Sequence, residues 1–387
     1  MDFRFTPAQQ RFREEVRTFL RQELPHFKGT GDAESFGAFS QAFSKKLAAR
    51  GWIGLAWPKE YGGQELGHIE RTIFTEEMVL HEAPTAYHFI AERQMGPSLI
   101  RHGTEEQKRY FLPRIVSADV SFCIGMSEPG AGSDLANVQT RAVRDGDEYV
   151  VNGQKIWTSN AHLADWMWLV CRTDPNAPKH RGISILLVDM KSPGITVRPL
   201  INMAGTHGFN EVFFEDVRVP ARNLVGEENR GWYIVAENLD FERSGIERIA
   251  ATAGLFRDLV DYVRAHRDRG RRGPALAARL ELADRAIEYE VGRMLAYRVA
   301  WLLSQGRVPN YEASMSKVYG SEWTQRLART GVKIMTAFGM ARTPEERALR
   351  AKIERAYLTT AAATIQGGTS EIQRNIIATR GLGLPRS

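Results

Sequence analysis

The sequence has few of the features that mark secreted or membrane-spanning proteins. Its only cysteines are Cys123 and Cys171, which argues against a disulfide framework and favours a reducing compartment. No apolar run approaches the roughly 20 residues that cross a bilayer. Residues 1–7 do not lead from a basic into an apolar segment, as a secretory signal would. We therefore expect a cytoplasmic protein with no membrane insertion.

A recognisable nucleic-acid motif is also missing, although the formal net charge is +6. The densest basic run, residues 264–272, contains five arginines but no interleaved aromatic residue. We therefore expect no nucleic-acid partner. The run is either a solvated loop or a site for ligand phosphates, and the sequence leaves both open.

What the sequence does contain is the composition of a globular protein, with 43% hydrophobic and 25% charged residues over 387 positions. Apolar residues recur at helical spacing up to about Ile115 and again after Gly226. Between about Ser121 and Val225 the apolar runs are short and rich in β-branched and aromatic residues, and Asn152-Gly153 predicts a hairpin turn. We predict an α+β fold of three domains: N-terminal helices over 1–118, a middle β-barrel or sandwich over 119–226, and a C-terminal helical bundle over 227–387.

The first candidate for a ligand site is the loop of residues 126–134, Met-Ser-Glu-Pro-Gly-Ala-Gly-Ser-Asp. Its small residues allow a ligand to approach the backbone closely, and Ser127 and Ser133 offer hydroxyl groups. The structural alternative is an ordinary glycine-rich loop.

A second candidate lies at residues 155–160, where Trp157 precedes Thr158 and Ser159. An aromatic ring there could cover a flat heterocycle while the hydroxyl groups bond to the edge of that heterocycle. A tryptophan in a strand can equally be a core residue, so this interpretation stays open as well.

A third candidate lies near the C-terminus, where Gly367 and Gly368 are followed by Thr369 and Ser370. Gln373 lies three residues after Ser370, the spacing of a capping box with Ser370 as the N-cap. The start of a helix favours anionic or hydrogen-bond-accepting ligands. The alternative is a capped helix with no ligand.

A single charge interrupts an apolar stripe in the segment that begins near Trp232. On one continuous helix Glu242 would share a face with apolar residues only: Val235, Leu239, Ile246, Ile249 and Ala253. Burial of an unpaired carboxylate is costly, so Glu242 is either paired with a buried arginine or is a base with a raised pKa. Glu247, four residues after Arg243, would lie on the polar face in an exposed ion pair.

Together these segments, in this order and at these separations, resemble the acyl-CoA dehydrogenase family. The resemblance covers almost the whole chain, and its most specific parts are residues 127–134, 152–157 and 368–374. It implies FAD as cofactor, an acyl-CoA thioester as substrate and electron-transfer flavoprotein as electron acceptor. It also implies the family's fold, with N-terminal helices, a middle β domain and a C-terminal four-helix bundle, assembled as a tetramer.

The resemblance implies roles for individual residues. FAD would be contacted by residues from two parts of the chain: Ile124, Met126, Ser127, Ser133, Trp157, Thr158, Ser159, Thr369 and Glu371. The acyl-CoA substrate would be contacted by Ser133, Asp240, Arg243, Gly367 and Gly368. We expect no metal site.

The catalytic base occurs at one of two positions in the family. Most members carry a glutamate directly before the C-terminal Gly-Thr pair, where this chain has Gly367. A minority, of the isovaleryl-CoA dehydrogenase type, carry it within Leu-Asp-x-Glu-Arg, which residues 239–243 match with Glu242. Glu242 is therefore the predicted base, with Glu247 as second choice. It would remove the Cα proton while a hydride passes from Cβ to flavin N5, and hydrogen bonds would polarise the thioester carbonyl.

Two departures from the family pattern affect the cross-subunit half of the flavin site. Homotetrameric members usually have Arg-x-x-Phe-Gly after the first bundle helix, but residues 267–273 contain no Phe-Gly. Further on, a glutamine and paired glycines are replaced by Lys333 and Thr336-Ala337. These departures resemble the bacterial heteromeric branch, which includes members acting on steroid side-chain CoA thioesters. A homotetramer and a heterotetramer both remain open, and in a heterotetramer the single chain would bind FAD weakly by itself.

Two other functions fit the same residues. One is a flavin oxidase or monooxygenase on the same fold, which depends on oxygen access that the sequence does not report. The other is a non-catalytic partner subunit of a heteromeric acyl-CoA dehydrogenase. Glu242 argues against the latter, because an inactive site has little use for a carboxylate in an apolar setting.

Overall fold

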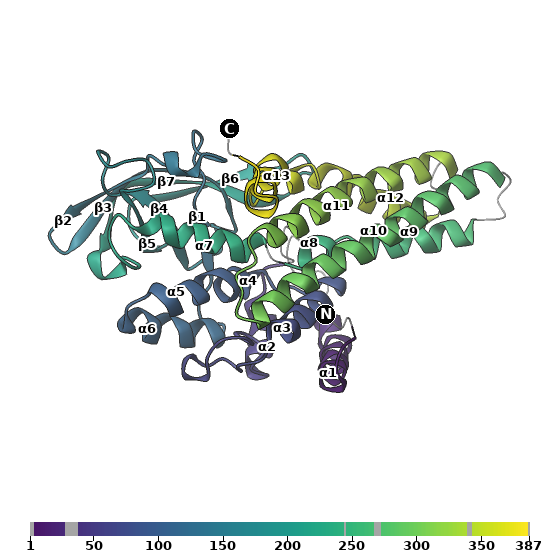
Figure 1. Ribbon diagram of the computed structural model, residues 1–387, viewed down its shortest axis with the longest axis horizontal. Coiled ribbons are helices and arrows are strands. Elements are labelled where there is room, and N and C mark those ends of the chain that lie inside the picture. The colour runs from purple at the N-terminus through teal and green to yellow at the C-terminus, as the bar shows by residue number, and fades with distance from the viewer. Residues whose placement is uncertain (1–3, 28–37, 244, 267–271, 339–342, 386–387) are drawn as a thin grey trace. The chain divides into compact units, whose positions relative to one another are not determined.

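The computed structural model describes residues 4–27, 38–243, 245–266, 272–338 and 343–385, apart from the side chains of residues 239–243 and 272–275. The chain divides into two compact units (Figure 1). One unit, the sheet unit, consists of residues 23–67 and 83–242. The other, the helical unit, consists of residues 1–22, 68–82 and 243–387.

The first unit is built on one seven-stranded sheet. Its strands are β1 (Phe122–Gly125), β2 (Arg141–Asp145), β3 (Glu148–Ser159), β4 (Trp166–Arg172), β5 (Ile183–Asp189), β6 (Ile195–Ile201) and β7 (His207–Pro220). The strand order is β1-β4-β2-β3-β7-β6, and β5 pairs with β4. β4 is parallel to β1 and β2, and the other pairs are antiparallel. Alternate residues of β3 and β7 are buried in a shared apolar core, as expected for a sheet that covers a core with one face.

The predicted hairpin turn at Asn152-Gly153 is wrong. The turn between β2 and β3 lies at Gly146-Asp147, where Asp145 is paired with Glu148. Gly153 lies instead in a bulge of β3 with a φ of +149°, and a Cβ at this position would lie 2.7 Å from the Cα of Thr140. The glycine is therefore required by the close approach of two chain segments and by the bulge, not by a turn.

Short helices complete this unit: α2 (Gln41–Ala49), α4 (Ala86–Ile90), α5 (Gly96–His102), α6 (Glu105–Val116) and α7 (Gly231–Arg243). α4 leads through a π-helical turn, Ala91–Met95, into α5. α6 begins with a capping box in which Thr104 and Gln107 bond to each other's backbone N–H groups. Gly96 admits the ring of Trp57, because a Cβ at this position would lie 1.9 Å from that ring.

The second unit is helical. Its helices are α1 (Pro7–Glu23), α3 (His68–Leu80), α8 (Glu247–Ala250), α9 (Ala253–Ala265), α10 (Arg272–Ser304), α11 (Tyr311–Phe338), α12 (Pro344–Thr359) and α13 (Ser370–Ile376). α9, α10, α11 and α12 form a closed four-helix bundle, since each of them packs against two of the others (Figure 1). Trp323 and Leu327 on α11 are fully buried in its core. No helix in the described part of the chain is long and apolar enough to cross a membrane.

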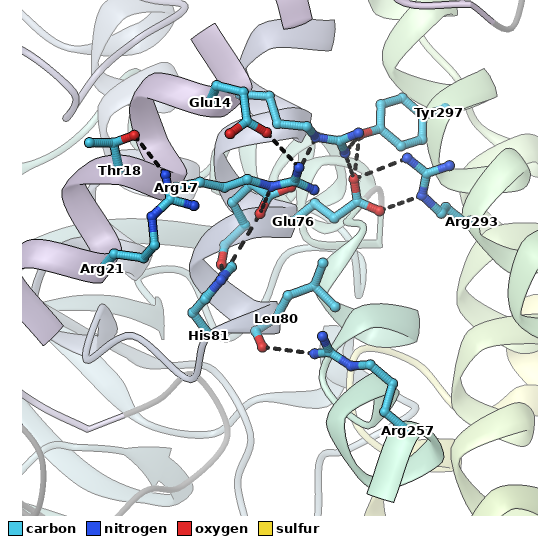
Figure 2. A network of polar contacts seen from close by, with 12 residues as sticks. Glu14, Arg17, Thr18, Arg21, Glu76, Leu80, His81, Arg257, Arg293 and Tyr297 are labelled. Carbon is cyan, nitrogen blue, oxygen red and sulfur yellow. Dashed lines mark hydrogen bonds and ion pairs between the residues drawn. The ribbon is translucent and has the colours of Figure 1, made fainter. Parts of the chain in front are cut away.

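Within the helical unit, a buried carboxylate joins three helices. Glu76 on α3 is 1% exposed and accepts hydrogen bonds from Arg13 on α1 and from Arg293 and Tyr297 on α10 (Figure 2). The Tyr297 hydroxyl lies 2.7 Å from Glu76, and Arg293 Nε lies 2.5 Å from it. The neighbouring Glu77 is paired with Arg13 at 2.9 Å. Burial would lower the pKa of Arg293, but the bond to Glu76 outweighs it and raises that pKa.

We expect Glu76→Gln to lower the free energy of unfolding by about 3–5 kcal/mol, because Arg13 and Arg293 would stay buried without their shared counter-charge. Urea denaturation of the two proteins measures this difference. Glu14→Gln is the matched control, because Glu14 forms an exposed pair with Arg17 at 2.7 Å and should cost at most about 1 kcal/mol. Equal losses in the two variants would show that the Glu76 network adds nothing to stability.

Candidate active site

The loop that follows β1 is bonded to strand β3. The Ile156 N–H donates to the Ser127 carbonyl at 2.9 Å, and Lys155 Nζ donates to the Met126 carbonyl at 3.0 Å. Ile124 lies two residues before Met126 and is half-buried. The structure therefore brings the first two sequence candidates, residues 126–134 and 155–160, together.

The outer side of this loop is open. A Cβ built on Gly130 or on Gly132 would meet no atom within 4 Å. Ser133 is exposed beside them, and Ser127 is half-buried. A ligand can therefore approach the loop backbone directly, which a larger residue at either glycine would hinder.

Trp157 projects from β3 at a bulge. The register between β3 and β7 shifts between Lys155 and Thr158, and Trp157 has a φ of +61°, which is rare for a residue with a side chain. Its side chain is 60% exposed and contacts Phe209 edge to face, with ring centroids 6.3 Å apart. This excludes the core interpretation of Trp157. Strained backbone of this kind persists where a site requires it.

The residues after Trp157 are anchored by β7. Asn210 Nδ2 donates to the Thr158 carbonyl at 3.0 Å, and Ser159 is paired with Phe209. The Thr158 hydroxyl is buried and has no hydrogen-bond partner among the described residues. It is therefore an unpaired polar group in the interior, whereas the neighbouring Ser159 is half-buried.

A buried ion pair lies beneath the loop and the bulge. Lys155 is fully buried and its Nζ lies 2.7 Å from Glu128 Oε1. Glu128 also accepts from the backbone N–H groups of Gln139 at 2.6 Å and Thr140 at 2.9 Å. Burial acts to raise the pKa of Glu128, but Lys155 and these donors outweigh it, so the pKa is lowered. Burial lowers the pKa of Lys155, and Glu128 offsets part of that change.

The roles of Glu128 and Lys155 were not predicted. A signal was present, because Tyr149, Val151 and Lys155 alternate along β3 and all three are buried. A lysine at an inward position of a strand requires a buried acidic partner.

The C-terminal candidates lie in the helical unit. Gly367 and Gly368 have φ values of +65° and +84°, which favour glycine. The predicted cap is wrong by one residue: Thr369, not Ser370, is the N-cap of α13, and its hydroxyl accepts from the Ile372 N–H at 3.3 Å. The amide of Gln373 donates to the Gly367 carbonyl at 3.0 Å, which accounts for the glutamine at that position.

Glu371, the other C-terminal candidate for FAD, follows in the first turn of α13 and is exposed. A hydrogen bond from its own backbone N–H, and then one from Thr369, lower the pKa of its carboxyl. Its charge is therefore retained to lower pH than that of an isolated glutamate.

The predicted continuous helix around Glu242 is wrong. α7 ends at Arg243 and α8 begins at Glu247. The apolar stripe is nevertheless buried at Val235, Ile246, Ile249 and Ala253. The side chains of Leu239, Asp240, Glu242 and Arg243 lie outside the described residues.

Glu247 is also not where we predicted it. It is 9% exposed, so it is buried and not on a solvated face. The interruption between α7 and α8 changes its direction, because helical periodicity does not extend across the interruption. Its carboxylate packs over Gly245, where a Cβ would lie 1.8 Å from Oε2.

Two segments depart from the family pattern of cross-subunit flavin contacts: residues 267–273, and Lys333 with Thr336-Ala337. The structure describes the second fully and the first only in part. Residues 267–271 of the first lie outside the described residues. In the second, Lys333 on α11 forms an exposed ion pair with Glu281 on α10 at 2.8 Å. Lys333 is therefore paired within its own bundle.

The described residues meet the requirements of a flavin. A flat ring system requires an exposed aromatic face, hydrogen-bonding groups at its edge and access to the backbone. Trp157 supplies the first, the half-buried Ser127 and Ser159 the second, and the open positions at Gly130 and Gly132 the third. No group of three or more His, Cys, Asp or Glu residues in the described part of the chain could hold a metal ion.

Three family models match the chain in sequence order. They describe the N-terminal domain of acyl-CoA dehydrogenases over residues 6–119, the middle domain over residues 123–217 and the C-terminal domain over residues 229–382. The chain belongs to the acyl-CoA dehydrogenase family. Members of this family are FAD-dependent oxidoreductases, so FAD is the cofactor that the residues above have to accommodate.

Individual acyl-CoA dehydrogenases are similar over the full length. "Acyl-CoA dehydrogenase FadE26" of Mycobacterium tuberculosis is 38% identical, with 100% of each chain covered. The solved structure "Tcur3481-Tcur3483 steroid ACAD" has a TM-score of 0.88 at 36% identity, again with 100% of each chain covered. The "ChsE4-ChsE5 complex from Mycobacterium tuberculosis" has a TM-score of 0.84 at 37% identity, with 100% of each chain covered.

Proposed function

We propose that this acyl-CoA dehydrogenase desaturates its acyl thioester between Cα and Cβ, with Glu242 as the base that removes the Cα proton. The exposed Trp157 on its strained bulge, beside an open glycine-rich loop, is the observation that supports flavin chemistry. The match of residues 239–243 to Leu-Asp-x-Glu-Arg supports Glu242 as the base. FAD, when bound, supplies the acceptor for two electrons. Met126, Ser127, Thr158 and Ser159 are proposed to hold it together with Trp157.

The chain's own residues remove the proton and contact the substrate and FAD. Glu242 on α7 holds the proton that leaves Cα. Gly367 and Gly368 present backbone without side chains, so no carboxylate competes with Glu242 at that position. Ser133, Asp240 and Arg243 are proposed to contact the CoA thioester, and Ile124, Thr369 and Glu371 to complete the FAD contacts.

We propose further that a second chain completes the flavin site. Two similar structures are named as complexes of two different proteins, and residues 267–273 lack the Phe-Gly of homotetrameric members. One of those structures is named a "steroid ACAD", so a bulky ring-bearing acyl group is the first substrate to test. Electron-transfer flavoprotein is the proposed electron acceptor.

The visible spectrum of the purified protein tests these proposals together. We expect substoichiometric FAD in the single chain, and bleaching of the flavin bands when a ring-bearing acyl-CoA thioester is added without oxygen. Full FAD occupancy in the single chain would contradict the two-chain assembly. A flavin-loaded protein that no acyl-CoA thioester bleaches would contradict the desaturation itself. Rapid reoxidation by oxygen, compared with electron-transfer flavoprotein, would favour an oxidase.

A further inference from the structure

Two buried polar atoms near α7 have no hydrogen-bond partner among the described residues. They are Oε1 of Gln94, in the π-helical turn before α5, and Nδ2 of Asn238 on α7. Gln94 is 3% exposed and Asn238 is fully buried. Buried polar groups in folded proteins are almost always paired, so two such atoms in one place call for a partner.

The two side chains are neighbours. The Ser98 hydroxyl on α5 donates to Asn238 Oδ1. Gln94 lies four residues before Ser98, which places both on one face where the π-helical turn continues into α5. Helical spacing therefore puts Gln94 within one turn of Ser98, the residue that bonds to Asn238.

α7 is also joined to α5 by charged groups. Glu237 is paired with Arg101, and His102 Nε2 lies 2.7 Å from its carboxylate. Asn238, the next residue, is thereby fixed in position over α5. Gln94 and Asn238 are both buried, so bulk water does not satisfy their free polar atoms.

The pair also lies close to the proposed base. Asn238 lies four residues before Glu242 on α7, a separation of about 6 Å along the helix axis. The backbone of the proposed base is therefore about one helical turn from Asn238.

We propose, on the basis of the proposed function, that the acyl group of the substrate carries a hydroxyl group that bonds to both side chains. The hydroxyl donates to Gln94 Oε1 and accepts from Asn238 Nδ2. One O–H group can do both, whereas a ketone oxygen can only accept and a methylene group does neither. The substrate class is therefore a hydroxylated ring-bearing acyl-CoA thioester.

Equilibrium binding tests this without turnover. Isothermal titration of the FAD-loaded protein with 3-(4-hydroxycyclohexyl)propenoyl-CoA, its 4-oxo analogue and 3-cyclohexylpropenoyl-CoA compares one hydroxyl, one ketone and no oxygen. We expect the hydroxyl compound to bind at least about tenfold more tightly than the compound without oxygen, with the ketone between them.

Two variants and a control assign the preference to these atoms. Asn238→Leu and Gln94→Met should each bring the ratio of the two dissociation constants towards one. Gln107→Met makes the same chemical change at another buried glutamine, whose amide donates to the Arg222 and Leu224 carbonyls at 2.7 and 2.8 Å, and should keep the ratio.

Equal affinities of the wild-type protein for the hydroxyl compound and the compound without oxygen would overturn the inference. A preference that persists in both variants would overturn it as well. Buried water would then be the partner of Gln94 Oε1 and Asn238 Nδ2. If both variants remove the preference, the hydroxyl inference is supported. That holds even if no thioester bleaches the flavin, because the absence of bleaching would reject only the proposed desaturation.

Discussion

Replacing Glu242 by glutamine should slow the reduction of bound flavin by an acyl-CoA thioester by about 10²–10⁴-fold, the usual contribution of a positioned general base. The amide has nearly the same shape as the carboxyl group but cannot take up the Cα proton. The flavin bands should remain, because Glu242 is not among the residues proposed to hold FAD. Anaerobic stopped-flow absorbance measures the rate. Exchange of the α-hydrogens of the substrate into heavy water measures proton removal by itself.

Glu247→Gln is the matched control, five residues along the chain. Glu247 is buried at the start of α8 with its carboxylate against Gly245, which gives it a structural explanation that does not involve the substrate. We expect α-hydrogen exchange to persist in Glu247→Gln and to be lost in Glu242→Gln. The opposite pattern would assign the base to Glu247, and loss in neither variant would exclude both carboxylates.

The order of domains and the bundle could be predicted from the sequence because apolar periodicity is a local property of each segment. Val235, Ile246 and Ile249 were expected to be buried and are buried. The spacing could not show that the helix stops at Arg243 and restarts at Glu247, because the residues on both sides keep the same apolar period. The burial of Glu247 follows from that interruption.

The site itself was predictable only in part. The two segments around Ser127 and Trp157 were identified, but their contact depends on hydrogen bonds between residues about 30 positions apart. The strain at Trp157 depends on a bulge that is set by pairing with β7. Asn152-Gly153 shows the same limit, because a dipeptide typical of turns is used here for the close approach of Thr140. Pairing between distant segments decides such cases, not local preference.

Lys155→Met should be the most destabilising substitution in the sheet unit, with a loss of about 3–5 kcal/mol in the free energy of unfolding. The methionine fills most of the volume of the lysine but leaves the Glu128 carboxylate buried without its cation. The loop at Met126 would lose its bond to Lys155 Nζ as well. Because that loop is proposed to contact FAD, flavin affinity should fall together with stability.

The double variant Lys155→Met/Glu128→Gln separates the charge from the packing. It removes both ions and keeps one amide oxygen as acceptor where Glu128 offers two, one for the N–H of Gln139 and one for that of Thr140, so it should recover part of the lost stability. The pH dependence gives a second check. The pKa of Glu128 is lowered in the folded protein, so its contribution is complete above the ordinary value of 4.5 and is lost as the pH falls through the folded-state pKa. The stability difference between wild type and Lys155→Met, measured by urea denaturation, should therefore shrink as the pH falls from above 4.5 through the lowered pKa of Glu128. A difference that stayed constant with pH would show that lost packing, and not the unpaired carboxylate, destabilises the variant.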